Sequence, residues 1–357
     1  MLSFTDHRAD PTGWARELGI CSEAVEIYLA SDVIDLHIDA FIWHRVFGYD
    51  LRKRHGLGLF GRRYYGHVDF PRALEAQLTG AIWVITTNPG RTARGRLATF
   101  RRNQAELQRL FASVDDQLCL VRNVAEYRTA RQAGKHGAFV GIQGGNALDA
   151  DLDALDAIEE DLIVRITLVH LSSSRIGTTS SPLSMGRDQG LTDFGRAYVQ
   201  RLNEKKIFVD LAHINRRGFF DAVEVHDRSQ PLMVTHTGIS GVYEHWRNLD
   251  DEQLRAIADT GGTIGVMFHA DFLGPGDRGH HGSAIVDHLE HVVKTVGDDY
   301  ASLGSDWDGA ITTQRDIPTC LELPRLVQLM LDRGWSPDRI RKILGGNFLR
   351  VVEQLRG

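Results

Sequence analysis

Cysteine is scarce in this sequence, and its few cysteines are too far apart to act together. Of the 357 residues, three are cysteines, at positions 21, 119 and 320, and none of them forms a C-x-x-C pair. This spacing argues against a disulfide framework and against a thiolate zinc site. The composition is that expected of a cytoplasmic protein.

Long apolar runs and an excess of basic charge are also missing. No stretch reaches the roughly 20 apolar residues that a membrane-spanning helix needs. The first ten residues are polar, unlike a signal peptide. Lysine and arginine number 41 against 47 aspartates and glutamates, which gives a net charge of −6. We therefore expect a soluble chain whose partner is a small molecule rather than nucleic acid or a membrane.

A recurring pattern is present instead: a short apolar run, a polar turn and then a helical stretch. There are eight such runs: 32–38, 81–86, 138–142, 164–170, 207–211, 232–235, 263–268 and 301–304. Nearly continuous apolar character over four to seven residues is typical of strands buried on both faces. Eight strands alternating with helices predict a single parallel (β/α)8 barrel, although a doubly wound sheet is the alternative.

The segments between and around these runs predict the rest of the organisation. Charged amphipathic stretches predict helices over 192–205, 250–258, 283–296 and 324–332. Residues 1–30 and the last 40 residues are expected to form helical flanks of one domain spanning 1–357. Segment 40–80 is too long for a plain strand-to-helix connection, so we expect a lid or insertion over the active site.

Two further patterns have plain interpretations. The glycines of 56–61 match G-x-G-x-x-G, but they follow a basic stretch and not a strand, which favours a loop over a dinucleotide site. Five arginines fall within 91–102, and a solvated helix face is the favoured reading of them over an anion site.

Polar side chains cluster at the predicted carboxyl ends of the strands, where barrel enzymes build their active sites. They are His37 and Asp39 on strand one, Gln143, His170, His213, His236 and Asp306. Any one histidine alone is better explained as a satisfied polar residue in a turn. The set as a whole supplies the nitrogen and oxygen ligands that a divalent transition metal such as zinc requires. Asp306 is the natural general base and acid beside a metal-activated water.

The ordered motifs of this chain resemble those of the membrane (renal) dipeptidases, peptidase family M19, within the amidohydrolase superfamily. The similar segments are Asp35–Asp39, His67–Pro71, Gly190–Gly195, Val209–His213, Arg247–Leu249, Gly304–Gly309 and Asn347–Val351. Together they span about residues 30 to 353. This resemblance implies a zinc-dependent dipeptidase that sometimes accepts a D-residue at the C-terminal position, and it makes a homodimer plausible.

The resemblance also assigns roles to individual residues. His37 and Asp39 would bind one zinc ion, and His213 and His236 would bind the other. His170 would polarise the scissile carbonyl, and Asp306 would transfer the proton. Arg247 would hold the free carboxylate of the substrate, since its planar guanidinium pairs with a carboxylate in a bidentate manner.

One position departs from the family in a way that matters chemically. Gln143 stands where the family has a glutamate that bridges both metals. An amide offers one neutral oxygen, and its NH₂ group repels a cation. Three readings follow: a binuclear dipeptidase with a weaker second site, a mononuclear hydrolase of another amide, lactone or ester, or a ligand-binding relative without catalysis. The number of zinc ions, one or two, stays open.

One further position differs from the family, and the sequence argues against one other class of barrel enzyme. His269 lies near the position where some family members carry a substrate-facing tyrosine, so it is a candidate for side-chain specificity. A metal-free sugar-phosphate barrel enzyme is disfavoured, because no glycine-rich phosphate loop follows strands seven and eight.

Overall fold

The computed structural model describes residues 1–55, 65–87, 90–182, 184 and 189–357. Its strands form one parallel sheet that runs β1-β3-β5-β6-β7-β8-β9-β10, with the short β4 paired to β5. The strands are β1 Ile34–Ile38, β3 Gly80–Thr86, β4 Leu118–Leu120, β5 His136–Gln143, β6 Ile163–Thr167, β7 Phe208–Asp210, β8 Met233–Thr237, β9 Thr263–Val266 and β10 Ala301–Leu303. The eight predicted strands are confirmed, and β4 was not predicted.

The sheet closes on itself between its first and last strands. Ile38 forms a parallel bridge with Trp307, and the Asp39 N–H donates to the Trp307 carbonyl over 2.9 Å. The Ser305 N–H donates to the Asp35 carboxylate over 3.0 Å. The fold is therefore the predicted (β/α)8 barrel, nearly closed, with the carboxyl ends of β1 and β10 side by side.

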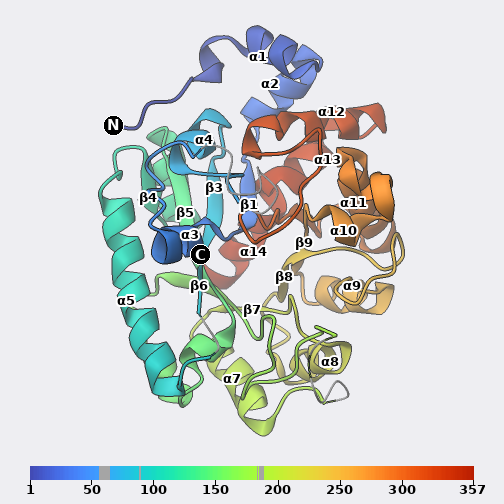
Figure 1. Ribbon diagram of the computed structural model, residues 1–357. Coiled ribbons are helices and arrows are strands. Elements are labelled where there is room, and N and C mark those ends of the chain that lie inside the picture. The colour runs from blue at the N-terminus through green and yellow to red at the C-terminus, as the bar shows by residue number, and fades with distance from the viewer. Residues whose placement is uncertain (56–64, 88–89, 183, 185–188) are drawn as a thin grey trace.

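Helices surround the barrel (Figure 1). They are α1 Pro11–Leu18, α2 Ser22–Ala30, α3 Ala40–Phe47, α4 Phe70–Glu75, α5 Ala93–Ala112, α6 Val124–Gln132, α7 Asp193–Glu204, α8 Arg216–Val225, α9 Asp251–Ala258, α10 Ala270–Leu273, α11 Gly282–Val296, α12 Pro324–Asp332, α13 Pro337–Arg341 and α14 Asn347–Arg356. Helices α1 and α2 lie beside α12 and α13, which confirms the predicted helical flanks.

Local sequence explains where the helices begin. Asp250 caps α9 in a capping box, accepting from the Gln253 N–H while the Gln253 side chain accepts from the Asp250 N–H. Thr192 caps α7 by accepting from the Gly195 N–H. Of the two patterns set aside above, 91–102 falls in and just before α5, whereas 56–61 lies outside the described residues.

Apolar side chains fill the barrel interior near the amino-terminal ends of the strands. Side chains two or four positions apart on a strand face the same side. The polar residues Gln143, Asp210 and Thr235 face the barrel interior. The apolar residues that precede them at these spacings, Phe139, Phe208 and Met233, therefore face it too. Phe348 of α14 closes this end, with its ring 5.1 Å from that of Phe139. These side chains fill the amino-terminal half of the barrel interior, and a larger apolar cluster packs the strands against the helices. None of the described helices is both long enough and apolar enough to cross a bilayer.

Candidate metal centre

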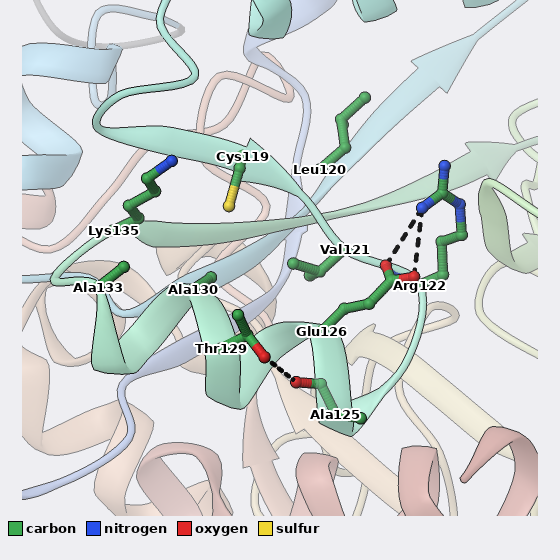
Figure 2. Close-up of a pocket in the computed structure, with 10 residues that line it drawn as sticks. All are labelled: Cys119, Leu120, Val121, Arg122, Ala125, Glu126, Thr129, Ala130, Ala133 and Lys135. Carbon is green, nitrogen blue, oxygen red and sulfur yellow. Dashed lines mark hydrogen bonds and ion pairs between the residues drawn. The ribbon is translucent and has the colours of Figure 1, made fainter.

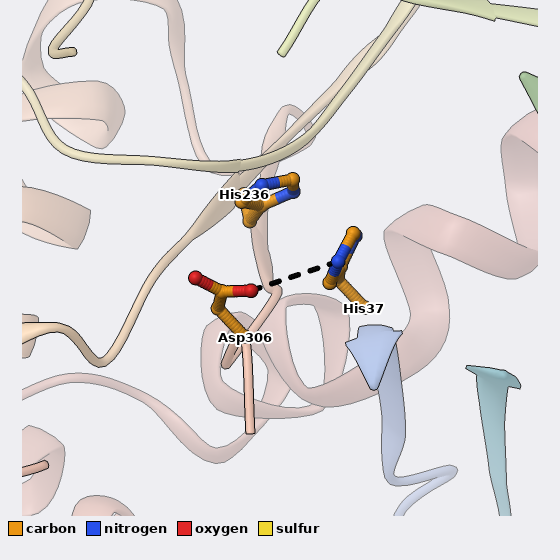
Figure 3. Close-up of side chains that lie close together, drawn as sticks. All are labelled: His37, His236 and Asp306. Atoms are coloured by element: carbon orange, nitrogen blue, oxygen red, sulfur yellow. Dashed lines mark ion pairs between the residues drawn. The ribbon is translucent and has the colours of Figure 1, made fainter. Parts of the chain in front are cut away.

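Three of the predicted residues converge at the mouth of the barrel. His37 is the next-to-last residue of β1, His236 lies within β8, and Asp306 follows β10 (Figure 3). One ligand atom from each lies within 4.8 Å of the others, the only such group of three among the described residues. The closing contacts between β1 and β10 bring His37 Nε2 to 3.6 Å from Asp306 Oδ1. Asp306 has φ +65°, a left-handed backbone that an aspartate adopts at some cost.

Two more predicted residues border this group. Asp39 Oδ2 lies 3.3 Å from His37 Nε2, and Asp39 Oδ1 accepts a hydrogen bond from the Thr86 hydroxyl over 2.8 Å. On the other side, His213 Nε2 lies 2.8 Å from His236 Nε2. The five side chains thus present nitrogen and oxygen atoms to one small region, a donor set that suits zinc.

Gln143, the last residue of β5, lies between these two sides. With the amide oriented so that both of its atoms have suitable partners, its nitrogen faces the Asp39 oxygens at 2.9 and 3.0 Å, and its oxygen lies 3.3 Å from both His37 Nε2 and His213 Nε2. The side chain therefore holds the position of a bridge, but it directs a hydrogen-bond donor at the neighbouring carboxylate and offers a single neutral oxygen to a cation.

His170 is near the site. The sequence predicted it at the end of a strand, but this is wrong. Strand β6 ends at Thr167, so His170 lies on the loop that follows it. Its ring is 4.7 Å from the ring of His213, edge to face. The apolar run extended past the strand because Leu168 and Val169 are buried in the loop. The histidine reaches the site from this loop.

Burial governs the protonation of the site. It lowers the pKa of His213 and His236 well below the usual value and lowers the pKa of His170 to about 4. These imidazoles are therefore neutral at pH 7, the form that binds metal ions. Burial and the nearby Asp39 carboxylate instead raise the pKa of Asp306, against the opposing effect of Arg247. The site holds neutral nitrogens beside a carboxyl group that retains its proton readily.

Arg247 is buried against the same strand. It donates from Nη2 to the His236 carbonyl over 2.8 Å, and its Nε has no partner among the described residues. Burial lowers its pKa to about 10, so it remains a cation at pH 7. A cavity of about 120 Å³ is lined by His213, Trp246 and Arg247 among others. A buried cation beside an open cavity is suited to an anionic group on a ligand.

His269 does not belong to the group of ligand atoms. It directly precedes the short helix α10 without a side-chain capping bond, and its ring stacks on Phe272 at 4.2 Å between centroids. Phe272 also stacks on His245, at 4.1 Å, two residues before Arg247. The structure thus connects His269 to the Arg247 loop through an aromatic stack.

Sequence reasoning missed a layer of buried polar residues directly beneath the ligands. Arg165 and Asp210 are fully buried, and Arg165 Nη1 lies 3.2 Å from Asp210 Oδ2. Arg165 Nη2 also contacts His37 Nδ1 at 2.7 Å. The available signal was a single arginine within the otherwise apolar run 163–166, because an unpaired charge is not tolerated in a buried strand.

A second, larger pocket lies away from this site. It has a volume of about 400 Å³ and lies between β4 and α6 (Figure 2). Strand β4 pairs with residues 136–138 of β5, whereas Gln143 is at the other end of that strand. The charged residues Arg122 and Glu126 at its edge pair with each other at 3.3 Å. This pocket is therefore separate from the candidate metal centre.

A parallel barrel with imidazoles and carboxylates at its carboxyl end is typical of metal-dependent hydrolases. The sequence profile of the membrane dipeptidases, peptidase family M19, matches residues 21–356, and the chain belongs to this family. The resemblance predicted from the motifs is confirmed, and so is the assignment as a hydrolase of the metallo-dipeptidase class.

Three individual relatives are similar to this chain. A metallopeptidase from Rhodobacter sphaeroides, solved with a phosphinate mimic of the dipeptide L-Ala-D-Ala, is 25% identical with a TM-score of 0.80, covering 91% of this chain and 99% of that one. The dipeptidase AC, a metallopeptidase of family M19, is 26% identical with a TM-score of 0.80, covering 91% and 98%. An uncharacterised protein from the pqqA 5′ region of Klebsiella pneumoniae is 30% identical over 257 residues, which is 70% of this chain and 94% of that protein.

Proposed function

We propose that this protein is a zinc-dependent dipeptidase that cleaves the peptide bond of dipeptides. The observation that carries the proposal is the convergence of His37, His236 and Asp306 at the mouth of an M19 barrel. His37 and Asp39 would hold one zinc ion, and His213 and His236 would hold a second. The neutral imidazoles and the close approach of the His213 and His236 nitrogens fit such a cation.

When bound, zinc supplies Lewis acidity toward the peptide carbonyl and lowers the pKa of water. The protein's own residues transfer the proton and stabilise the charge that develops on the carbonyl oxygen. Asp306, buried and readily protonated, accepts a proton from the attacking water and delivers it to the leaving amine. Neutral His170 donates a hydrogen bond to the carbonyl oxygen as negative charge develops on it.

Arg247 would select the substrate through its free carboxylate. A buried guanidinium beside a cavity binds a carboxylate strongly, because the pair is shielded from water. The relative from Rhodobacter sphaeroides was solved with a mimic of L-Ala-D-Ala, which supports a dipeptide with a C-terminal D-residue as substrate. His269, connected to the Arg247 loop by stacked rings, would influence which side chain is accepted.

Gln143 favours weaker binding of the second metal ion. Replacing a bridging carboxylate by an amide removes one negative charge from between two dications, and the amide nitrogen already faces Asp39. A mononuclear hydrolase of an acyl-amino acid, lactone or ester is therefore the second candidate.

Helix α3, at the start of segment 40–80, would form one wall of the site. Helix α3 begins directly after Asp39, and Trp43 Nε1 donates to the Asp308 carbonyl over 2.6 Å. The position of this helix between the end of β1 and the loop that carries Asp306 supports the proposal of a lid or side element.

The test is hydrolysis of matched substrates by zinc-loaded protein. We expect release of alanine from L-Ala-D-Ala and L-Ala-L-Ala, with much slower cleavage of L-Ala-D-Ala amide, which lacks the carboxylate. Cleavage of N-acetyl-alanine or a lactone with no cleavage of any dipeptide would select the second candidate. Inactivity on the whole panel with zinc bound would contradict both.

A further inference from the structure

A network of fully buried polar side chains lies directly beneath the candidate metal ligands. Its members are Arg165, Thr167, Asp210 and Thr235, all with no exposed surface. A buried ion pair inside an apolar barrel contributes little to stability, because both charges must leave water. The position of this pair between two histidines of the metal centre suggests another purpose.

One arm of the network leads from Asp210 to His236. Asp210 Oδ1 accepts the Thr235 N–H over 3.0 Å, and Asp210 Oδ2 accepts the Thr235 hydroxyl proton over 2.7 Å. Because that proton is donated to the carboxylate, Thr235 Oγ1 accepts from His236 Nδ1, which lies 2.9 Å away. The contact fixes the proton of neutral His236 on Nδ1. It leaves the Nε2 lone pair facing the metal centre.

The other arm leads from Asp210 to His37. Arg165 lies between them, with Nη1 3.2 Å from Asp210 Oδ2 and Nη2 2.7 Å from His37 Nδ1. Arg165 Nη1 also donates to Thr167 Oγ1 over 2.6 Å and to the Ile142 carbonyl over 3.0 Å. These bonds hold the guanidinium rigidly. The rings of His37 and His236 lie with their centroids 3.8 Å apart.

We propose that Asp210 is a positioning residue that sets the zinc affinity of this site by acting on His236 through the Thr235 hydroxyl. The inference rests on the proposed zinc function. Outer partners of this kind orient the ligand ring and fix its tautomer, and their loss typically weakens metal binding 10- to 100-fold.

Two threonines provide a matched pair of variants. Thr235 and Thr167 are both fully buried, and their hydroxyls donate to the same Asp210 oxygen over 2.7 and 2.6 Å. Only Thr235 also contacts a histidine. Thr235→Val and Thr167→Val each remove one hydroxyl bond to Asp210 at nearly constant volume, so a purely structural network would respond alike to both.

The experiment measures the zinc dissociation constant by competition with a chromophoric chelator, together with the melting temperature of the metal-free protein. We expect Thr235→Val to raise the dissociation constant about 10- to 100-fold and Thr167→Val to raise it less than about threefold. Both variants should lower the melting temperature similarly. Thr235→Ser, which keeps the hydroxyl, should restore the wild-type zinc affinity.

Equal zinc affinities in the two valine variants would overturn the proposal, and so would a failure of the serine variant to restore binding. The two hypotheses fail in different ways. Tight zinc binding with the expected contrast between variants, but no dipeptide hydrolysis, would refute the proposed function and leave the positioning role of Asp210 intact. Wild-type protein that binds no zinc would overturn both.

Discussion

Asp306 is a carboxyl group whose neighbours pull its pKa in opposite directions. Burial and Asp39 raise that pKa, whereas Arg247 and Arg165 lower it. General acid–base catalysis requires a group that can take up and release a proton near the operating pH, and a raised pKa brings a carboxyl group closer to that condition. Asp306→Asn keeps the shape of the side chain but cannot accept the proton, so we expect kcat to fall by about 10²- to 10⁴-fold.

The control for this prediction is the zinc content, measured by elemental analysis on the same preparation. The variant should retain its zinc and its melting temperature. Near wild-type turnover of L-Ala-D-Ala by Asp306→Asn would refute the proposed proton transfer.

Arg247 gives a prediction about substrate binding. Loss of a charge-assisted, bidentate bond costs about 1.5–3 kcal/mol, which corresponds to a roughly 10- to 150-fold weaker interaction. We expect Arg247→Ala to raise KM for dipeptides by a factor in this range and to change KM for the dipeptide amide little. Steady-state kinetics on the two substrates measures the difference, and equal effects on both would argue against a carboxylate-binding role.

Gln143 gives a prediction about the number of metal ions. Gln143→Glu restores an anionic bridge between the two sides of the site, so we expect tighter binding of a second zinc ion. Isothermal titration of the metal-free protein with zinc would show this as a stronger second binding event than in the wild type. Identical titrations would mean that residue 143 does not control the second metal.

The same residue scale shows the limits of sequence reasoning. His37, His236 and Asp306 could be found because strands in a barrel end at one face, so polar residues at strand ends must meet. The roles of Arg165 and Thr235 could not be found in this way. They lie inside strands, and their contacts depend on the stagger between neighbouring strands, which the sequence does not state.

At the scale of elements, the apolar runs predicted strand identity well and strand ends less well. Strand β4 was missed because it is three residues long and only partly buried, too short to form a recognisable run. The run 164–170 overshot β6 by three residues because buried loop residues look like strand residues. Contacts that close the barrel, such as the Ile38–Trp307 bridge, join residues about three quarters of the chain apart, too far for local sequence patterns to show.

Strand β5 carries a histidine whose environment predicts a pH-dependent stability. His136 accepts from Trp83 Nε1 over 3.1 Å and lies 2.8 Å from the Leu78 carbonyl, so the neutral ring satisfies both partners. Burial lowers its pKa from 6.5 to about 4. Between these values the unfolded chain binds one proton more than the folded chain. Stability is therefore complete above about pH 6.5 and falls as the pH drops toward 4.

His136→Gln removes this titration while keeping one donor and one acceptor. We expect the free energy of unfolding of the wild type to drop by up to about 3 kcal/mol more than that of the variant between pH 7 and pH 4. Urea unfolding at a series of pH values measures both. Parallel pH profiles for the two proteins would contradict the assignment of a neutral, buried His136.

At the scale of the whole molecule, the two ends of the barrel interior have different roles: one is packed and the other holds the candidate site. The amino-terminal half is packed with apolar side chains and closed by Phe348, and the carboxyl-terminal half carries the polar layer and the ligand atoms. Bound metal would connect β1 and β8 with the loop after β7. We therefore expect zinc to raise the melting temperature, because it binds the folded chain only.

The most direct test of the account is to strip the protein with a chelator and assay L-Ala-D-Ala hydrolysis before and after zinc is returned, with the bound metal counted in each sample. We predict that the stripped protein is inactive and that activity returns in proportion to the zinc bound at this site. Full hydrolysis by protein shown to contain no metal would contradict the central claim.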